Sequence, residues 1–286
     1  MKGIVLAGGT GSRLWPITRS ISKQLLPVYD KPMIYYPIST LMLAGIREIL
    51  IITTPHDQSQ FKELLGDGSA LGVSFQYATQ PEPKGLAQAF TIGEEFLAGD
   101  SCLMILGDNI FHGAGLGRDI IRDLPTSGAH IFTYEVSNHS DYGILEVDPE
   151  EKPISITEKP TEFISNLAVT GVYFFDGKVS EVAKNVQPSK RGEVEITSVI
   201  DHYLKSGLLT FTRLSRGSAW LDTGNPDSLI DAAAYVKIIE DRTGLKIACL
   251  EEIALNQGWM TQDQIISRIT QYKLNSYAKY LQRLIK

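Results

Sequence analysis

The sequence predicts an α/β fold, in which a mainly parallel, mixed sheet is covered by helices on both faces and followed by a helical C-terminal region. Three observations support this prediction. Apolar, β-branched runs alternate with helix-period patterns along the first two-thirds of the chain, and this alternation is typical of a parallel sheet. A glycine-rich turn follows the first apolar run. Helix-capping residues recur from residue 225 onward.

The elements expected in residues 1–224 follow from hydrophobic periodicity and from the turn residues between the runs. Parallel strands need a crossover connection, which is usually a helix. Ligands in such sheets bind beyond the carboxyl ends of the strands. The pattern changes to short strands after residue 140, and we interpret that part as a second half of the same domain. We expect strands near 3–7, 48–53, 73–77, 102–106, 130–136, 172–175 and 208–214, and helices near 37–45, 57–65, 85–97, 116–124 and 195–205.

Residues 225–286 are expected to form a mainly helical region. Asn225 can cap a helix with Pro226 at its first position, and Gly244 follows the last apolar residue of its stripe, which is the usual arrangement of helix ends. Thr261 and Gln264 have capping-box spacing for a second helix. A final helix is expected to carry Tyr277, Leu281 and Leu284. The apolar stripes of these helices must cover either the sheet or a neighbouring subunit.

Composition excludes several classes of protein. The chain has 286 residues, 43% of them hydrophobic and 21% charged, as in ordinary globular proteins. A net charge of -6 argues against nucleic-acid binding, which needs a broad basic surface. No run approaches the length of a membrane helix or of a signal peptide. Cys102 and Cys249 lie among apolar neighbours, which favours two buried thiols and a cytoplasmic location.

The first glycine-rich turn predicts a phosphate-binding loop. Gly8-Gly9-Thr10-Gly11-Ser12-Arg13 follows the apolar run at 3–7, and a turn of small residues lets backbone N–H groups approach a polyphosphate. Arg13 and Lys23 supply positive charge. The segment lacks P-loop spacing, and Leu14 occupies the third glycine position of a dinucleotide fingerprint. A tight turn with two surface cations is the alternative.

Two aspartates form a candidate metal site. Asp108 follows the apolar run at 102–106, and Asp222 precedes a glycine turn and the capped helix at 225. Carboxylates on two strand-end turns facing a phosphate loop can hold Mg²⁺, which prefers oxygen ligands. The alternative is that each aspartate forms hydrogen bonds with its own turn.

Other turns offer candidate contacts for a base and a sugar. The Gln80 amide can match the edge of a pyrimidine, and Gly85 opens the start of a helix. Lys159 is a phosphate ligand by charge, while Glu158 can accept hydrogen bonds from sugar hydroxyls. Taken singly, each is equally consistent with a surface turn. The five histidines lack metal-ligand spacing, and no covalent nucleophile motif is present.

Taken together, these motifs resemble the sugar-nucleotidyltransferase family. The resemblance covers essentially the whole chain, and its most specific part is the segment 8–14 combined with 23–33. The other motifs recur in the family's order: Gln80 with Gly85-Leu86-Ala87-Gln88-Ala89, Gly107-Asp108-Asn109, Glu158-Lys159-Pro160 and Trp220-Leu221-Asp222-Thr223-Gly224.

The resemblance implies a Rossmann-like three-layer nucleotidyltransferase domain over residues 1–224, with nucleotide-binding and sugar-binding halves. It also implies Mg²⁺-assisted transfer from dTTP to glucose 1-phosphate. The products would be dTDP-glucose and pyrophosphate, in the first step of dTDP-rhamnose-type deoxysugar synthesis. The alternatives are transfer with UTP or another sugar 1-phosphate, and a nucleotide-sugar sensor without turnover. A nicotinamide dehydrogenase is disfavoured by Leu14.

The resemblance also assigns residues. Arg13 would stabilise the leaving pyrophosphate, Lys23 would neutralise the triphosphate, and Lys159 would hold the sugar phosphate. Asp108 and Asp222 would hold Mg²⁺. The nucleotide would contact Leu6, Gly8, Gly9, Thr10, Gly11, Gln24, Gln80, Gly85 and Asp108, and the sugar phosphate would contact Asn109, Tyr142, Gly143, Glu158, Lys159 and Val169.

Assembly and regulation are further expectations from the resemblance. The chain has no hexapeptide repeats and ends in helices, as do the short members of the family, whose helical C-terminus packs between the subunits of a homotetramer. Residues 225–286 are therefore expected to form a subunit interface. A dTDP-sugar feedback inhibitor would bind at a second site, for which His112 and Gly113 are the candidates.

Overall fold

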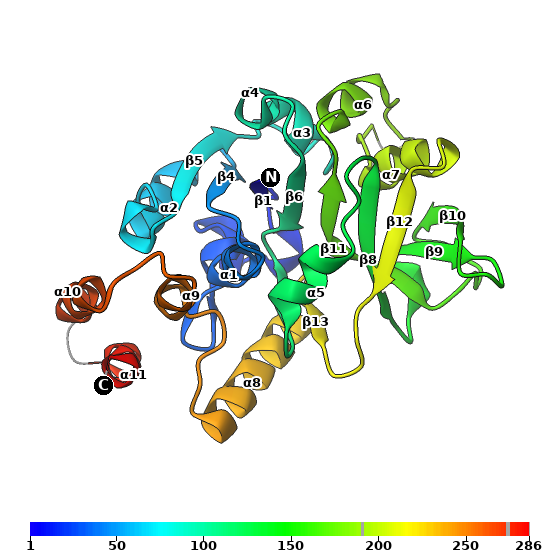
Figure 1. Ribbon diagram of the computed structural model, residues 1–286. Helices are drawn as coiled ribbons and strands as arrows, with labels where there is room; N and C mark the ends of the chain where they lie inside the picture. The colour runs from blue at the N-terminus through cyan, green and yellow to red at the C-terminus, as the bar shows by residue number, and fades with distance from the viewer. Residues whose placement is uncertain (190–191, 273–274, 286) are drawn as a thin grey trace.

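A computed structural model describes residues 1–189, 192–272 and 275–285. A nine-stranded sheet runs through the centre of the molecule (Figure 1). Its strands are β1 (Lys2–Ala7), β4 (Glu48–Thr53), β5 (Ser74–Thr79), β6 (Cys102–Leu106), β8 (Ala129–Glu135), β9 (Gly143–Val147), β10 (Pro153–Glu158), β11 (Leu167–Phe175) and β12 (Leu209–Arg213).

The sheet is parallel in its first half and mixed in its second. Strands β5, β4, β1 and β6 lie in that order and are parallel. β11 is antiparallel to β6 and β8, and β12 is parallel to β8. The β9–β10 hairpin joins the sheet where Ile144 pairs with Ala168 on β11. The predicted α/β class with a mainly parallel mixed sheet is confirmed.

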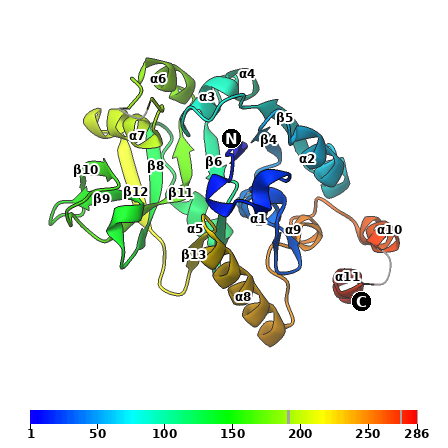
Figure 2. The ribbon, with the colours of Figure 1, turned by 180° about the vertical axis from the view of Figure 1, so that it is seen from behind.

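Helices cover both faces, which gives three layers (Figures 1 and 2). Neighbouring residues of a strand point to opposite faces, so Val5 belongs to one core cluster and Ile4 to the other. The first face is covered by α1 (Tyr35–Leu43), α2 (Gln58–Leu65), α5 (Leu116–Arg122) and α9 (Leu250–Asn256), and the second by α3 (Gln88–Ile92), α6 (Val179–Asn185) and α7 (Ile196–Lys205).

The C-terminal region has the predicted helix ends. In α8 (Pro226–Thr243) the Asn225 side chain accepts from the Ser228 N–H at 2.9 Å, and Gly244 ends the helix with a φ of 68°. Before α10 (Gln262–Tyr272), the Thr261 N–H donates to the Gln264 side chain at 2.8 Å, as the capping box predicts. The final helix is α11 (Ser276–Leu284).

The structure differs from the prediction at several short elements. The helix expected at 85–97 is split by Gly93 into α3 and α4 (Glu94–Leu97). Two antiparallel ladders were not predicted, because each strand has at most four residues and so carries little periodicity. They are β2 (Pro27–Val28) with β3 (Lys31–Pro32), and β7 (Asn109–His112) with β13 (Ala219–Asp222).

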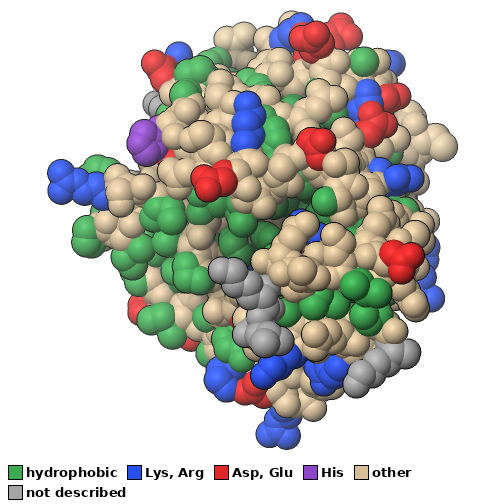
Figure 3. Space-filling model, turned by 90° about the vertical axis from the view of Figure 1, so that its left-hand side faces the viewer, with side chains coloured by type: hydrophobic (Ala, Val, Ile, Leu, Met, Phe, Trp, Pro, Cys, Tyr) green, Lys and Arg blue, Asp and Glu red, His purple; other side chains and the backbone are tan. Residues whose placement is uncertain are grey.

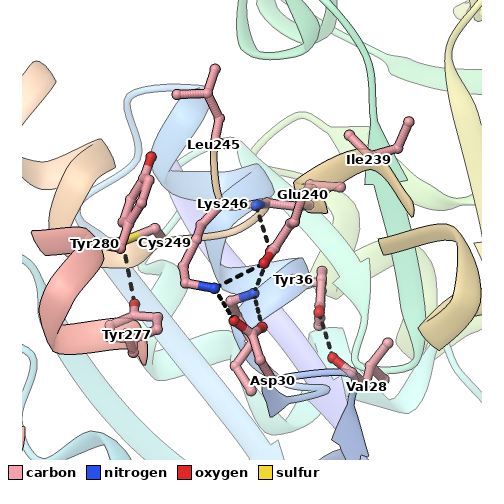
Figure 4. Close-up of polar contacts among 12 residues, drawn as sticks. Val28, Asp30, Tyr36, Ile239, Glu240, Leu245, Lys246, Cys249, Tyr277 and Tyr280 are labelled. Atoms are coloured by element: carbon pink, nitrogen blue, oxygen red, sulfur yellow. Dashed lines mark hydrogen bonds and ion pairs between the residues drawn. The ribbon is translucent and has the colours of Figure 1, made fainter. Parts of the chain in front are cut away.

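A largely buried cluster of four charges attaches the β2–β3 turn to the C-terminal region (Figure 4). Glu240, at the end of α8, accepts from Lys31 and from Lys246, each at 2.9 Å. Asp30 pairs with both lysines. The Ile247 N–H also donates to Glu240. The four charges balance, and their hydrogen bonds offset the cost of burial.

The surface carries exposed apolar side chains as well as charges. The side of the molecule that bears α2 and α10 shows apolar side chains between scattered charged ones (Figure 3). On α8, Ile230 and Ile238 are 66% and 57% exposed. Across the described ranges, no helix has both the length and the apolar character needed to cross a membrane. Cys102 and Cys249 are buried free thiols, as expected.

Replacing Glu240 by alanine should destabilise the protein by about 3 kcal/mol, because Lys31 and Lys246 each lose one of their two carboxylate partners. Asp241→Ala is the matched control, since Asp241 forms an exposed pair with Lys237 on the same helix, and such a pair is worth less than about 1 kcal/mol. Chemical denaturation of both variants measures the difference. Equal losses would show that the buried cluster contributes no more than the surface pair.

His130 should lower the free energy of unfolding of the protein at acidic pH. Burial lowers its pKa to about 4, with Asp123 opposing the shift, and its ring nitrogens contact Thr210 and Thr212 at 2.7 and 3.0 Å. The unfolded chain protonates below a pKa of about 6.5 while the folded chain stays neutral, so stability is lost as pH falls from about 6.5 to about 4.

Between pH 7 and pH 5 this histidine alone should remove about 2 kcal/mol of the free energy of unfolding. Urea denaturation at both pH values, compared with His130→Gln, isolates its contribution. An unchanged pH dependence in the variant would contradict this prediction.

Candidate active site

A cleft opens beyond the carboxyl ends of β1 and β6, where parallel sheets bind ligands. Three adjoining cavities form it. The loop cavity, of about 210 Å³, lies under the turn after β1 and is lined by Gly9, Thr10, Gly11, Ser12, Arg13, Lys23, Gln24, Asp108 and Gly224. The central cavity has about 500 Å³ and the aromatic cavity about 130 Å³.

The turn after β1 is shaped by contacts that leave little room for side chains. Gly11 has a φ of 62°, and a Cβ there would lie 3.1 Å from Thr18. Thr18 donates to the Gly11 carbonyl at 2.7 Å. The Arg13 guanidinium lies about 3 Å from where a Gly224 Cβ would be. Arg13 therefore lies against the residues that lead into α8, as a cation that lines the loop cavity.

A partly buried ion pair joins Lys23, in the segment that follows the turn after β1, to the end of β6. Lys23 Nζ donates to Asp108 Oδ2 at 2.6 Å, and the lysine side chain is only 5% exposed. Burial works to raise the pKa of Asp108, but the Lys23 charge and hydrogen bond, with help from Asn109, outweigh it and hold that pKa below its usual value. Asp108 is therefore ionised at neutral pH.

The β7–β13 ladder brings the second aspartate beside the first. Asp222 pairs in register with Asn109, and Thr223 donates to the Asp108 carbonyl through its hydroxyl at 2.8 Å. Burial raises the pKa of Asp222, and the neighbouring Asp108 charge raises it further, against Lys23, Arg13 and Lys159. The site thus holds two carboxylates that repel each other, and a cation between them would relieve this repulsion.

The described residues contain no group of three or more His, Cys, Asp or Glu side chains arranged to hold a metal ion. A Mg²⁺ ion needs only one or two protein carboxylates when substrate phosphates and water supply the remaining oxygens. Asp108 and Asp222, both lining the central cavity, therefore fit such an ion by donor type and by charge.

Gln80 lies at the deep side of the central cavity and is 4% exposed. Its Nε2 donates to the Gly85 carbonyl at 3.2 Å and to Gln88 Oε1 at 2.8 Å. A Cβ on Gly8 would lie 2.4 Å from Gln80 Oε1. Gly8 is therefore needed beneath this amide, although it is not among the residues that line the cavity.

The aromatic cavity is built around Trp220. The sequence places this residue in a motif but gives it no role. Its Nε1 donates to Asn109 Oδ1 at 2.6 Å, and its ring lies 5.0 Å from that of Tyr142. Asn109 in turn donates to Asp108 at 3.0 Å. Thr197 and Gly171 also line this cavity. Thr197 has no local motif, because α7 reaches the cleft only through the fold.

The structure brings the predicted site residues to one cleft. Apart from Gly8, every one of them lines at least one of the three cavities. The residues proposed for a second site lie elsewhere. His112 contacts the Tyr235 hydroxyl of α8 at 2.8 Å, and Gly113 packs against Ser218.

With this geometry in place, comparison with known proteins defines the class. The family model described as Nucleotidyl transferase matches residues 2–238. The chain belongs to the nucleotidyl transferase family, which confirms the resemblance seen in the motifs, and it is an enzyme.

Its curated relatives are more specific. A glucose-1-phosphate thymidylyltransferase of Mycobacterium tuberculosis is 52% identical over 286 residues, covering 100% of this chain and 99% of the relative. One from Xanthomonas campestris pv. campestris is 54% identical, and the match covers 100% of this chain and 97% of the relative.

Solved structures agree with this class. A Bacillus anthracis structure, described as a glucose-1-phosphate thymidylyltransferase with sucrose, has a TM-score of 0.76 at 41% identity and covers 82% of this chain and 94% of its own. A UDP-glucose pyrophosphorylase complexed with UDP-glucose has a TM-score of 0.72 at 25% identity. The match covers 83% of this chain and 98% of that structure's chain.

Gly8→Ala should impair nucleotide binding, because the new methyl group must displace the Gln80 amide. We expect the KM for the nucleoside triphosphate to rise about tenfold or more, the loss of roughly one hydrogen bond. Ser74→Ala is the control, because Ser74 is an exposed residue at the start of β5 that does not line the three cavities. Steady-state kinetics with varied nucleotide measure both. An unchanged KM in Gly8→Ala would refute this account of the pocket.

Proposed function

We propose that this enzyme transfers a thymidylyl group from dTTP to glucose 1-phosphate, giving dTDP-glucose and pyrophosphate. The observation that carries the proposal is the continuity of the cleft. A cationic glycine loop, a pair of carboxylates and a polar aromatic cavity adjoin in that order. The names of the relatives supply the substrates.

The triphosphate would lie in the loop cavity, against the backbone of the turn after β1 and the charges of Arg13 and Lys23. The base would enter the central cavity beside Gln80 and Gly85. Leu6 lines the central cavity, and Gln24 lines both the loop cavity and the central cavity. Both positions support the proposed contacts with the nucleotide.

The sugar would fill the aromatic cavity. Tyr142, Gly143 and Val169 line it, and Glu158 lies between it and the central cavity. Lys159 lines the central cavity from the same turn and would hold the sugar phosphate near the α-phosphorus. Its backbone N–H donates to the Tyr142 carbonyl at 2.9 Å, so the sugar-facing and phosphate-facing residues are joined directly.

The reaction would be an in-line displacement. An oxygen of glucose 1-phosphate forms a bond to the α-phosphorus of dTTP, and the bond from that phosphorus to the bridging oxygen of pyrophosphate breaks. Catalysis of this kind comes from positioning and charge stabilisation. Arg13 and Lys23 would carry the charge that moves onto pyrophosphate, and Lys159 would orient the attacking oxygen.

Asp108 and Asp222 would hold a Mg²⁺ ion, which when bound supplies charge neutralisation at the reacting phosphates. The charge arrangement supports this proposal, because burial and then the neighbouring Asp108 charge raise the pKa of Asp222, and a bound cation would favour its ionised form. Lys23 would then serve both Asp108 and the incoming phosphates.

Assembly and location are parts of the same proposal. The exposed apolar residues Ile230 and Ile238 of α8 fit a subunit interface formed by residues 225–286 in a cytoplasmic homotetramer. A dTDP-sugar inhibitor would bind outside the cleft, and the separation of His112 from the three cavities is compatible with a role there. The pathway would be dTDP-rhamnose-type deoxysugar synthesis.

The test is pyrophosphate release with Mg²⁺ and glucose 1-phosphate, comparing dTTP with UTP in parallel. We expect dTTP to be preferred, with measurable use of UTP, because one methyl group in a pocket is worth roughly 1–3 kcal/mol. Faster release with UTP or with another sugar 1-phosphate would keep the nucleotidyl-transfer reaction but assign a different nucleotide-sugar product. Binding of dTTP without turnover would support a sensor instead.

Asp222→Asn should lower turnover about a hundredfold or more, because a Mg²⁺ ligand and its charge are lost. Asp227→Asn serves as control, since Asp227 is an exposed aspartate in the first turn of α8. Turnover of both variants across a Mg²⁺ titration measures the effect. Near-normal activity of Asp222→Asn at low Mg²⁺ would remove this residue from the metal site.

A further inference from the structure

Both amide hydrogens of Gln80 are used within the protein. One is donated to the Gly85 carbonyl at 3.2 Å and the other to Gln88 Oε1 at 2.8 Å. A primary amide has two N–H donors and one carbonyl acceptor. The amide therefore has only its oxygen left for a ligand.

The orientation of this amide follows from chemistry. A backbone carbonyl can only accept a hydrogen bond, so the Gln80 nitrogen must face Gly85. The same nitrogen then faces Gln88, which must present its oxygen in return. Turning the Gln80 amide over would place its oxygen against two acceptor oxygens and break both hydrogen bonds. Gln88, in the first turn of α3, thus supplies the stronger of the two restraints by distance.

The oxygen of Gln80 lies close to Gly8, at the wall of the central cavity. Within residues 1–189, 192–272 and 275–285, no protein donor forms a hydrogen bond to this oxygen. Polar atoms in such a setting normally find a partner. A ligand base that carries an N–H on its pairing edge would provide one.

We propose that Gln88 determines base selectivity by holding Gln80 with its acceptor toward the nucleotide. Gln88 is a positioning residue, which acts through Gln80. This inference rests on the proposed function and adds the reason for its base preference. Thymine and uracil carry an N–H donor at N3 and are accepted. Cytosine carries a lone pair at N3, which would face the Gln80 oxygen and be repelled.

The experiment compares dTTP with dCTP, which share the deoxyribose and triphosphate. The ratio of their kcat/KM values is measured for the unaltered enzyme, Gln88→Met and Gln88→Glu. Methionine keeps the size of the side chain but offers no acceptor of comparable strength, whereas glutamate keeps an acceptor. Gln76→Met is the matched control, because Gln76 is an exposed glutamine on β5.

The unaltered enzyme should prefer dTTP at least about a hundredfold, because a mismatched polar group is left unpaired. In Gln88→Met that ratio should fall about tenfold, the equivalent of one hydrogen bond, through faster use of dCTP. Gln88→Glu and Gln76→Met should keep the ratio. Gln88→Ala gives the same test should Gln88→Met not fold.

Two results would overturn the inference. A slower Gln88→Met enzyme with an unchanged dTTP to dCTP ratio would mean that Gln88 has only a structural role. Loss of the ratio in Gln88→Glu as well would mean that its acceptor is not what matters. Failure of the unaltered enzyme to release pyrophosphate with dTTP would instead reject the proposed function, so the two failures are distinguishable.

Discussion

The short ladder between β7 and β13 is the constraint on which the active site depends. It pairs residues more than a hundred positions apart and sets Asp222 opposite Asn109. Asp108 precedes the first of these strands and Thr223 follows the second, and the Thr223 hydroxyl donates to the Asp108 carbonyl. The ladder thus holds both carboxylates at one end of the sheet, while Trp220, on the same strand as Asp222, forms the wall of the adjoining cavity. The proposed metal, phosphate and sugar regions are therefore fixed relative to one another by this one ladder.

Charge balance links this site to the remainder of the molecule. Lys23 neutralises Asp108 from the segment that leads directly into the β2–β3 turn. Asp30 and Lys31 of that turn are in turn held by Glu240 and Lys246. A buried lysine is favourable only where carboxylates surround it, so the two lysines of this segment fix its path at both ends. The C-terminal region consequently supports the loop that presents Lys23, although none of its described residues beyond Gly224 lines the three cavities.

Amide groups in the cleft are oriented by the protein before any ligand binds. The Asn109 amide donates to the Asp108 carboxylate and accepts from the Trp220 indole. These two hydrogen bonds fix the orientation of the amide. Gln80 is held in the same manner by Gly85 and Gln88. Groups that are already oriented cost less free energy to use on binding. The same restraints determine which hydrogen-bonding pattern a ligand must offer, so rigidity and selectivity have a common origin here.

The sequence by itself determined the fold class, the main strands and helices, and the helix ends at Asn225, Gly244 and Thr261, because periodicity and capping act over a few neighbouring residues. It also indicated the chemistry of the site, since glycines, cations and aspartates at strand ends have few other uses together. Only the tertiary structure decided which groups meet. The pairing of Lys23 with Asp108, the place of Thr197, and the charge cluster around Glu240 join residues far apart in the chain. No local pattern encodes such contacts, because they arise when helices and strands pack into one core.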